Sequence, residues 1–145
     1  MNSLLLIFLL NQIPDSAAAI PKGPFPISPK VFHHPAKVVF NTRPYEIDLF
    51  VDFHEKEIES ASLFLKTEAM HNYTEYPLQK VRARYRHRFD PNKTPAKTIS
   101  YFFVVTLKDH SVFAAPLNAN GNIIIVERTL EDPAEYFRRR LAQRR

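Results

Sequence analysis

Apolar and polar residues alternate along much of this chain beyond Val38. Ile47, Leu49, Val51 and Phe53 occupy every second position, which is the spacing of one face of a β-strand. Other alternating or apolar runs follow, and turn residues separate them. We therefore predict further strands at 61–66, 73–78, 81–89, 99–107, 112–115 and 123–126.

The predicted strands are short and closely spaced, which indicates an all-β domain. The turns at 90–93, 109–111 and 118–122 are too brief to hold the crossover helices of a parallel sheet. This spacing favours a two-sheet sandwich over residues 38–130. The run 99–107 is apolar on both faces and is expected to be a central strand. The predicted core is Leu49, Val51, Leu63, Leu65, Tyr85, Tyr101, Phe103 and Val105.

The first part of the chain differs from the rest in its composition. Seven consecutive apolar residues at 4–10 are followed by polar residues and then by three alanines that end at Ala19. This order is typical of a secretory signal peptide, so we predict one at 1–19 and a periplasmic or secreted mature protein. No Lys or Arg precedes the run, and a buried strand or a partner-bound peptide is the alternative interpretation. Residues 20–37 contain five prolines and are predicted to be extended.

The C-terminal segment 131–145 carries the signals of a helix. Asp132 suits the N-cap position and Pro133 suits the first helical position. Phe137 and Leu141 then continue from Pro133 at a spacing of four residues, which predicts a narrow apolar stripe on one helix face. Arginines surround this stripe and concentrate toward the C-terminal end, where the helix dipole favours them.

The positive charge of the chain is concentrated in this predicted helix. The formal net charge is +5, and the last ten residues contain five arginines and no acid. Without residues 1–19, whose only charged side chain is Asp15, the net charge is +6, so the body up to Glu135 is close to neutral. This distribution argues against a general nucleic-acid surface. An acidic partner or anionic lipid headgroups would complement the helix.

A row of arginines is the most unusual feature of the body. Arg82, Arg84, Arg86 and Arg88 occupy alternate positions, which places them on one face of the predicted strand. Like charges on one face repel unless acids compensate them, and acids such as Asp48 are available. The row is therefore either an ion-paired outer strand or a face that binds an acidic partner. We predict as partner-binding residues Arg82, Arg84, Arg86, Arg88, Phe137, Arg138, Arg139, Arg140 and Leu141.

Motifs for catalysis are absent from the sequence. The chain has no cysteine and only two glycines, which excludes disulfides, thiolate metal sites and glycine-rich phosphate loops. The pairs His33-His34 and Asp52/His54 each supply two possible metal ligands, which is too few for a site. We therefore predict no catalytic residue, no metal, no cofactor and no enzymatic activity.

One ordered series of residues resembles a known class of domain. The class is that of bacterial exported immunoglobulin-like or fibronectin-type-III-like domains of unassigned function, and the resemblance covers about residues 33–116. It implies a β-sandwich and little about function, because this architecture hosts many roles. The turn after Asp109 lacks the glycine that is usual there. The series consists of His34-Pro35, the segment 61–66, Tyr85, the segment 99–105, Asp109 and Pro116.

These observations favour a non-catalytic interaction module. The expected role is that of an exported accessory subunit that docks onto another envelope protein or membrane-associated complex. The alternative is a polysaccharide-binding module, which requires exposed aromatic rings. Tyr45, Tyr73 and Tyr76 are the candidates for such rings, but the chain contains no tryptophan.

Overall fold

Short β-strands make up most of the regular structure in the computed structural model, which describes residues 21–145. The predicted signal peptide at 1–19 lies outside the described residues. The strands are β1 (Val31–Phe32), β2 (Val39–Phe40), β3 (Tyr45–Val51), β4 (Ile58–Thr67), β5 (Thr74–Pro77), β6 (Gln79–Val81), β7 (Arg84–Phe89), β8 (Thr98–Leu107), β9 (Val112–Ala115) and β10 (Val126–Glu131). A 3-10 turn, Glu55–Glu57, precedes β4, and the helix α1 (Pro133–Gln143) follows β10.

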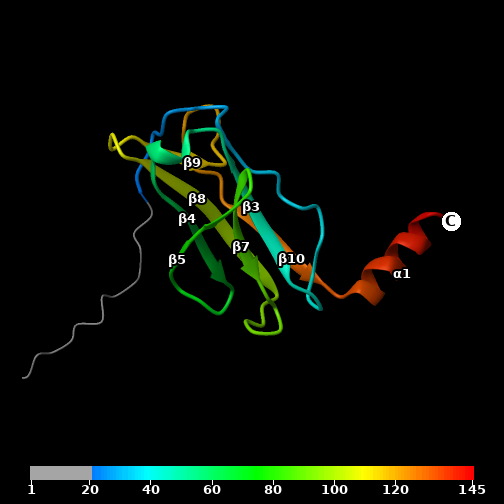
Figure 1. Ribbon diagram of the computed structural model, residues 1–145. Helices are drawn as coiled ribbons and strands as arrows, with labels where there is room; N and C mark the ends of the chain where they lie inside the picture. Colours follow the sequence, from blue (N-terminus) through cyan, green and yellow to red (C-terminus); the bar gives the residue numbers. More distant parts are fainter. Residues whose placement is uncertain (1–20) are drawn as a thin grey trace, which may run out of the picture.

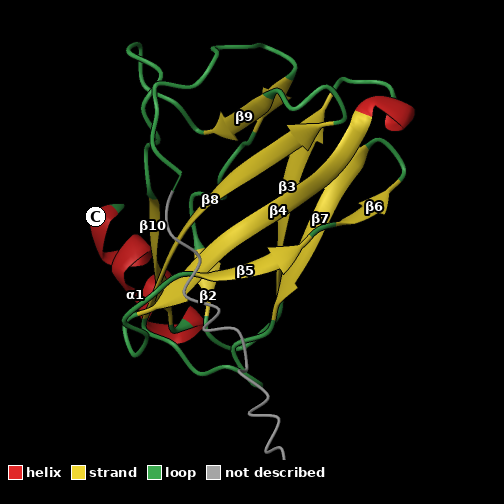
Figure 2. Ribbon diagram, turned by 90° about the vertical axis from the view of Figure 1, so that its left-hand side faces the viewer, coloured by secondary structure: helices red, strands yellow, loops and turns green. Residues whose placement is uncertain are grey.

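The strands form two sheets that lie face to face (Figures 1 and 2). The smaller sheet has the order β1-β3-β7-β6, and the larger has the order β2-β10-β8-β4-β5. One edge of β8 has two partners, because β10 pairs with its first half and β9 with its second half. The short edge strand β2 pairs with β10 in parallel. The prediction of an all-β domain built from two sheets is therefore confirmed.

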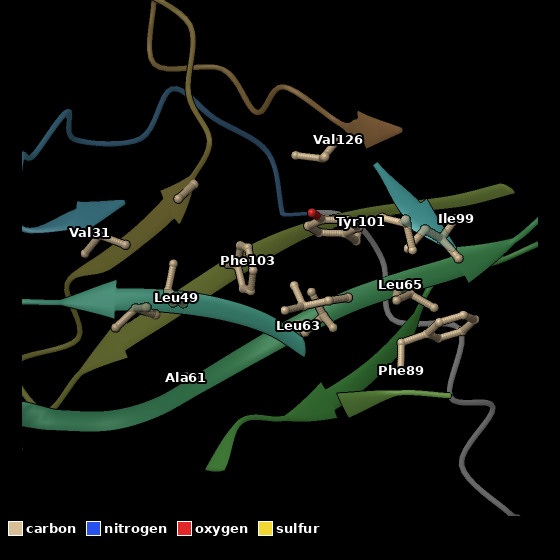
Figure 3. Close-up of a cluster of buried hydrophobic side chains, with 14 of the residues drawn as sticks. Val31, Leu49, Ala61, Leu63, Leu65, Phe89, Ile99, Tyr101, Phe103 and Val126 are labelled. Carbon is tan, nitrogen blue, oxygen red and sulfur yellow. The ribbon is translucent and has the colours of Figure 1, made fainter. Parts of the chain in front are cut away.

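The main hydrophobic core lies between the two sheets (Figure 3). Ile47 and Leu49 of β3 point from the smaller sheet toward the larger one, where Leu63 and Phe103 meet them. Of the eight predicted core residues, six are buried and two, Val51 and Tyr85, are half-buried against the same cluster. The alternation of apolar residues predicted which side of each strand faces the core, because every second side chain of a strand points to the same side of the sheet.

A second, smaller apolar cluster covers the opposite face of the larger sheet. Phe64 and Phe102 stack there with ring centroids 5.0 Å apart, and Ile123 and Ile125 pack against the cluster. The prediction of a strand at 123–126 is therefore wrong. The segment 123–125 packs against the outer face of the larger sheet through Ile123 and Ile125, and the last strand begins only at Val126.

The arginine-rich segment is folded differently from the prediction. Instead of one strand over 81–89, β6 and β7 form a hairpin in which Val81 pairs with Arg84. Arg82 and Ala83 make its two-residue turn, and Arg82 has a positive φ of 58°. Such turns favour glycine or asparagine. The prediction failed because the turn residues carry none of these signals and preserve the alternation.

The proline-rich segment lies along the sandwich rather than apart from it. Its residues Val31 and Phe32 form β1, and the backbone N–H of the buried Phe25 donates to the carbonyl oxygen of Gly121 at 2.8 Å. Gly121 has a φ of +79°, and a Cβ there would lie 2.6 Å from the carbonyl oxygen of Phe25. The predicted turn at 118–122 thus needs its glycine in order to receive this segment.

The helix α1 confirms the capping signals. The carboxylate of Asp132 accepts a hydrogen bond from the backbone N–H of Glu135 at 3.1 Å, and Pro133 occupies the first turn. Figure 1 shows the helix projecting beyond the end of β10, away from both sheets. No helix within residues 21–145 has the length and hydropathy needed to cross a bilayer.

Candidate interaction surfaces

The arginines of β7 lie beside acids of the neighbouring strand β3. Arg86 Nε lies 2.7 Å from one oxygen of Asp48, and Arg84 lies 3.1 Å from the other. Arg86 also contacts Glu46 at 2.6 Å, and Arg88 contacts the same carboxylate at 3.3 Å. The hydrogen bond from Arg86, helped by Arg84, lowers the pKa of Asp48. Two acids thus compensate most of the charge of three arginines.

This compensation weakens the arginine face as a site for an acidic partner. Partly exposed ion pairs contribute under about 1 kcal/mol each, and a new acid would have to compete with Glu46 and Asp48. Arg82 stands apart from the row because it forms the hairpin turn. Lys80 of the edge strand β6 pairs with Glu55 at 2.7 Å. The row therefore has the arrangement expected of an ion-paired outer face, and partner binding there stays a prediction.

The second candidate surface is the exposed side of α1. Phe137 and Leu141 of the predicted stripe are 56% and 65% exposed, and α1 has no buried residue. Two aromatic contacts join the helix to the sandwich. Tyr136 meets the edge of Phe40 in β2 with ring centroids 5.5 Å apart, and the ring of Phe137 lies 6.1 Å from that of Phe40. An ion pair between Arg139 and Glu131 supports them. The helix is thus anchored at its start and leaves two large apolar side chains uncovered.

A groove of about 500 Å³ runs between α1 and the β2 region. Phe40 lies on the sheet side of the groove, and Phe137 and Leu141 lie on the helix side. Arg43 is placed over the ring of Phe40, 5.0 Å from its centroid. Arg140 donates a hydrogen bond to the hydroxyl of Tyr136 at 3.0 Å. The groove therefore combines an apolar lining with arginines on both sides.

Five residues that line this groove were not among the predicted partner-binding residues, namely Val38, Phe40, Arg43, Tyr136 and Arg144. Phe40, Arg43 and Tyr136 come together because the parallel pairing places Val39 beside Leu130, just before α1 begins. Of these three residues, only Tyr136 had a local signal in the sequence, because it precedes Arg140 by one helical turn. Phe40 and Arg43 are far from α1 in the sequence, and no local pattern indicates that long-range pairing.

The aromatic candidates for sugar binding are engaged in packing. The hydroxyl of Tyr45 accepts a hydrogen bond from the backbone N–H of Ala36 at 3.3 Å. Tyr73 packs against Phe102, and Tyr76 packs against His87. All three tyrosines are half-buried. Tyr45 and Tyr76 pack against the main core, whereas Tyr73 packs against the outer cluster.

Two of the four possible metal ligands, His33 and His54, are likewise occupied by internal hydrogen bonds. Both ring nitrogens of His33 have partners, the carbonyl oxygen of Asp48 at 2.6 Å and the hydroxyl of Tyr101 at 2.8 Å. His54 accepts from the backbone N–H of Lys56 at the start of the 3-10 turn. Within residues 21–145, no three His, Asp or Glu side chains are grouped in a way that could hold a metal ion.

No protein-family model matches the chain, and no curated protein matches it. The interpretation of its surfaces therefore rests on their geometry and charge.

Proposed function

We propose that this chain is a non-catalytic, exported interaction module with an immunoglobulin-like fold. It serves as an accessory subunit that docks onto an envelope protein or a membrane-associated complex, in the periplasm or after secretion. Its principal contact element is α1 with the adjoining β2 region. The proposal of export is supported by the apolar run and the alanines of residues 1–19.

The order of the strands supports the immunoglobulin-like part of the proposal. In that fold the first, second, fifth and fourth strands form one sheet, and the third, sixth and seventh strands belong to the other. When β2, β5 and β9 are left out of the count, the orders β1-β3-β7-β6 and β4-β8-β10 follow this pattern, which supports the proposal. The resemblance of residues 33–116 to bacterial exported domains of this kind supports the same assignment.

The exposure of Phe137 and Leu141 is the observation that carries the proposed function. An isolated helix of eleven residues is marginal in water, and most helices persist because an apolar face is packed. Here the cap and the contact with Phe40 hold the helix, while its two largest apolar side chains stay in solvent. Apolar side chains on an ordered, projecting element are the usual anchors of a protein–protein contact.

Site-specific photo-crosslinking tests this proposal. A photoreactive phenylalanine analogue replaces Leu141 in the full chain, expressed in the cells that naturally make it. Ile27 is the matched control position because its side chain is equally exposed, at 65%. It belongs to the proline-rich segment, blue in Figure 1, which starts at the left and crosses the top of the sandwich, and it does not line the groove beside α1.

We expect a discrete crosslinked adduct from position 141 and none from position 27. Adducts of the same size and yield from both positions would indicate random collisions and would contradict the proposal. The absence of any adduct at position 141, with the chain present at its normal level, would contradict it as well.

A further inference from the structure

The groove beside α1 carries information about the chemistry of its occupant. Its apolar lining, made by Phe40, Phe137 and Leu141, is bordered by Arg43 on the sheet side and by Arg140 and Arg144 on the helix side. In the described part of the chain, no acidic residue lines this groove. An occupant must therefore present apolar side chains to the lining and negative charge to both borders.

The arginines that line the groove form no ion pair with an acid within residues 21–145. Glu131, the acid at the end of β10, is paired with Arg139, which lies outside the groove lining. Arg140 donates to a tyrosine hydroxyl and Arg43 is placed over an aromatic ring, so neither has a carboxylate partner in residues 21–145. The arginines of β7 differ in this respect, because they are paired with the carboxylates of Glu46 and Asp48. The groove is thus the more favourable site for a negatively charged segment.

The shape of the site disfavours a membrane as the occupant. A bilayer surface is flat on the scale of a few side chains, whereas α1 and the β2 region together line a hollow of about 500 Å³. A bilayer that met the projecting helix would contact Leu141 and leave the sheet side of the groove uncovered. Filling the hollow requires side chains that enter it, as those of a peptide segment do.

The charge of the helix disfavours a second copy of the chain. Pairing two helices through Phe137 and Leu141 would bring together ten arginines, five from the last ten residues of each copy, with no acid among those residues. Like charges brought together in this way cost free energy and suppress such pairing. The repulsion is largest at low salt, where screening is weakest.

We propose that the groove between β2 and α1 binds an acidic segment of the partner, with apolar side chains of that segment inserted against Phe40, Phe137 and Leu141. The inference rests on the proposed function and specifies its partner chemically. Apolar insertion supplies the affinity, and contacts from Arg43, Arg140 and Arg144 select for carboxylates.

Binding of designed peptides to the full chain tests the proposal. The probe is a short fluorescent peptide with leucines at i, i+4 and i+7 and glutamates between them. A second peptide replaces every glutamate by glutamine. Fluorescence anisotropy measures binding of both peptides to the unmodified chain and to two charge variants, in low and high salt.

The two charge variants each remove two positive charges, at different places on the chain. Arg140→Gln/Arg144→Gln removes two positive charges from the groove border. Lys93→Gln/Lys108→Gln removes the same charge at exposed positions outside the groove lining. All of these residues are exposed, and an unchanged melting temperature confirms that each variant is folded.

We expect the glutamate peptide to bind the unmodified chain more tightly than the glutamine peptide does. Arg140→Gln/Arg144→Gln should weaken its binding about tenfold, since two partly exposed ion pairs together reach that factor. The lysine variant should bind about as well as the unmodified chain. Phe137→Ala/Leu141→Ala should weaken both peptides, because it removes the apolar contact that they share.

Four results would overturn the acidic-segment proposal. The first is equal binding of the two peptides, and the second is an equal loss in the two charge variants. The third is sedimentation with phosphatidylglycerol vesicles, abolished by Arg140→Gln/Arg144→Gln, when neither peptide binds. The fourth is a dimer in analytical ultracentrifugation that Phe137→Ala abolishes. After any of these results, a specific crosslink at position 141 would still support an interaction module. The acidic-segment proposal can therefore fail while the proposed function stands.

Discussion

The ring of His33 links the two sheets, since its Nε2 atom lies 2.8 Å from the hydroxyl oxygen of Tyr101 in β8. Its Nδ1 atom lies 2.6 Å from the carbonyl oxygen of Asp48 in β3. A carbonyl oxygen only accepts, so Nδ1 must carry the proton, and in the neutral ring Nε2 accepts from Tyr101. The hydroxyl of Tyr45, 3.4 Å from that of Tyr101, extends this line of polar groups.

The stability of the domain should therefore decrease as the pH falls below neutral. Burial lowers the pKa of His33 and of His87 below the ordinary value of 6.5. The unfolded chain then binds protons at a higher pH than the folded chain does, so the free energy of unfolding falls as the pH drops through about 6.5 toward the folded pKa values. Chemical denaturation at a series of pH values between 8 and 5, on the order of the range where histidine titrates, measures this slope.

Replacing His33 by Gln should reduce the slope, because one of the two titrating groups is removed. His71→Gln, at an exposed position, is the control substitution. A slope that is the same in the unmodified chain and in His33→Gln would contradict the assignment to His33.

Phe102 and Phe103 should both be essential to stability, although they point to opposite faces of β8. Each is 0% exposed, Phe103 in the main core and Phe102 in the outer cluster. Replacing either one by Ala should cost about 3–5 kcal/mol in urea or thermal unfolding. Phe137→Ala, at an exposed site, should cost under about 0.5 kcal/mol. A small loss for Phe102→Ala would mean that the outer cluster contributes little.

Replacing His110 by Gly should stabilise the domain. His110 has a φ of 70° in the turn between β8 and β9, at the position where glycine is usual in such hairpins. Glycine relieves the strain in the folded chain, and the greater flexibility of the unfolded chain offsets part of this gain. The free energy of unfolding should therefore rise by about 0.5–1 kcal/mol, as measured by urea unfolding. His110→Ala keeps the strain and should give no gain. A stabilisation by Ala equal to that by Gly would point to another cause.

Removal of residues 136–145 should leave the melting temperature of the sandwich nearly unchanged. The segment contains no buried residue, and its removal loses two aromatic contacts with Phe40 and one ion pair. Such surface changes cost about 0.5 kcal/mol or less. Differential scanning calorimetry of the full and truncated chains measures the difference. Clearly earlier melting of the truncated chain would show that α1 is part of the folding unit.

The mature protein should begin at Ile20. The apolar run at 4–10 and the alanines that end at Ala19 predict cleavage at that bond. Intact-mass measurement on protein purified from the cells that naturally make it checks this directly. A chain that still carries Met1 would contradict cleavage and favour the alternative interpretation, in which the N-terminal run is retained.

Local patterns in the sequence predicted the parts of the fold that depend on neighbouring residues. Leu49 and Phe103 were assigned to the core because strands place alternate side chains on one face. The turn at Arg82 was not predicted, because Arg82 and Ala83 are not residues that favour a two-residue hairpin turn. Phe40 was absent from the predicted surface because its position next to α1 results from the pairing of Val39 with Leu130. That pairing joins segments far apart in the chain, and periodicity carries no information about it.

The direct junction between β10 and α1 has a mechanical consequence. Only Asp132 separates the last residue of the strand from the first residue of the helix, and its side chain caps the helix. A partner that pulls on α1 therefore pulls on β10 from its end. The strand is hydrogen-bonded to β8 on one side and to β2 on the other, and these bonds run across the strand direction. Tension on the helix is thus distributed as shear over two ladders at once, so the sandwich resists it collectively instead of opening one bond at a time.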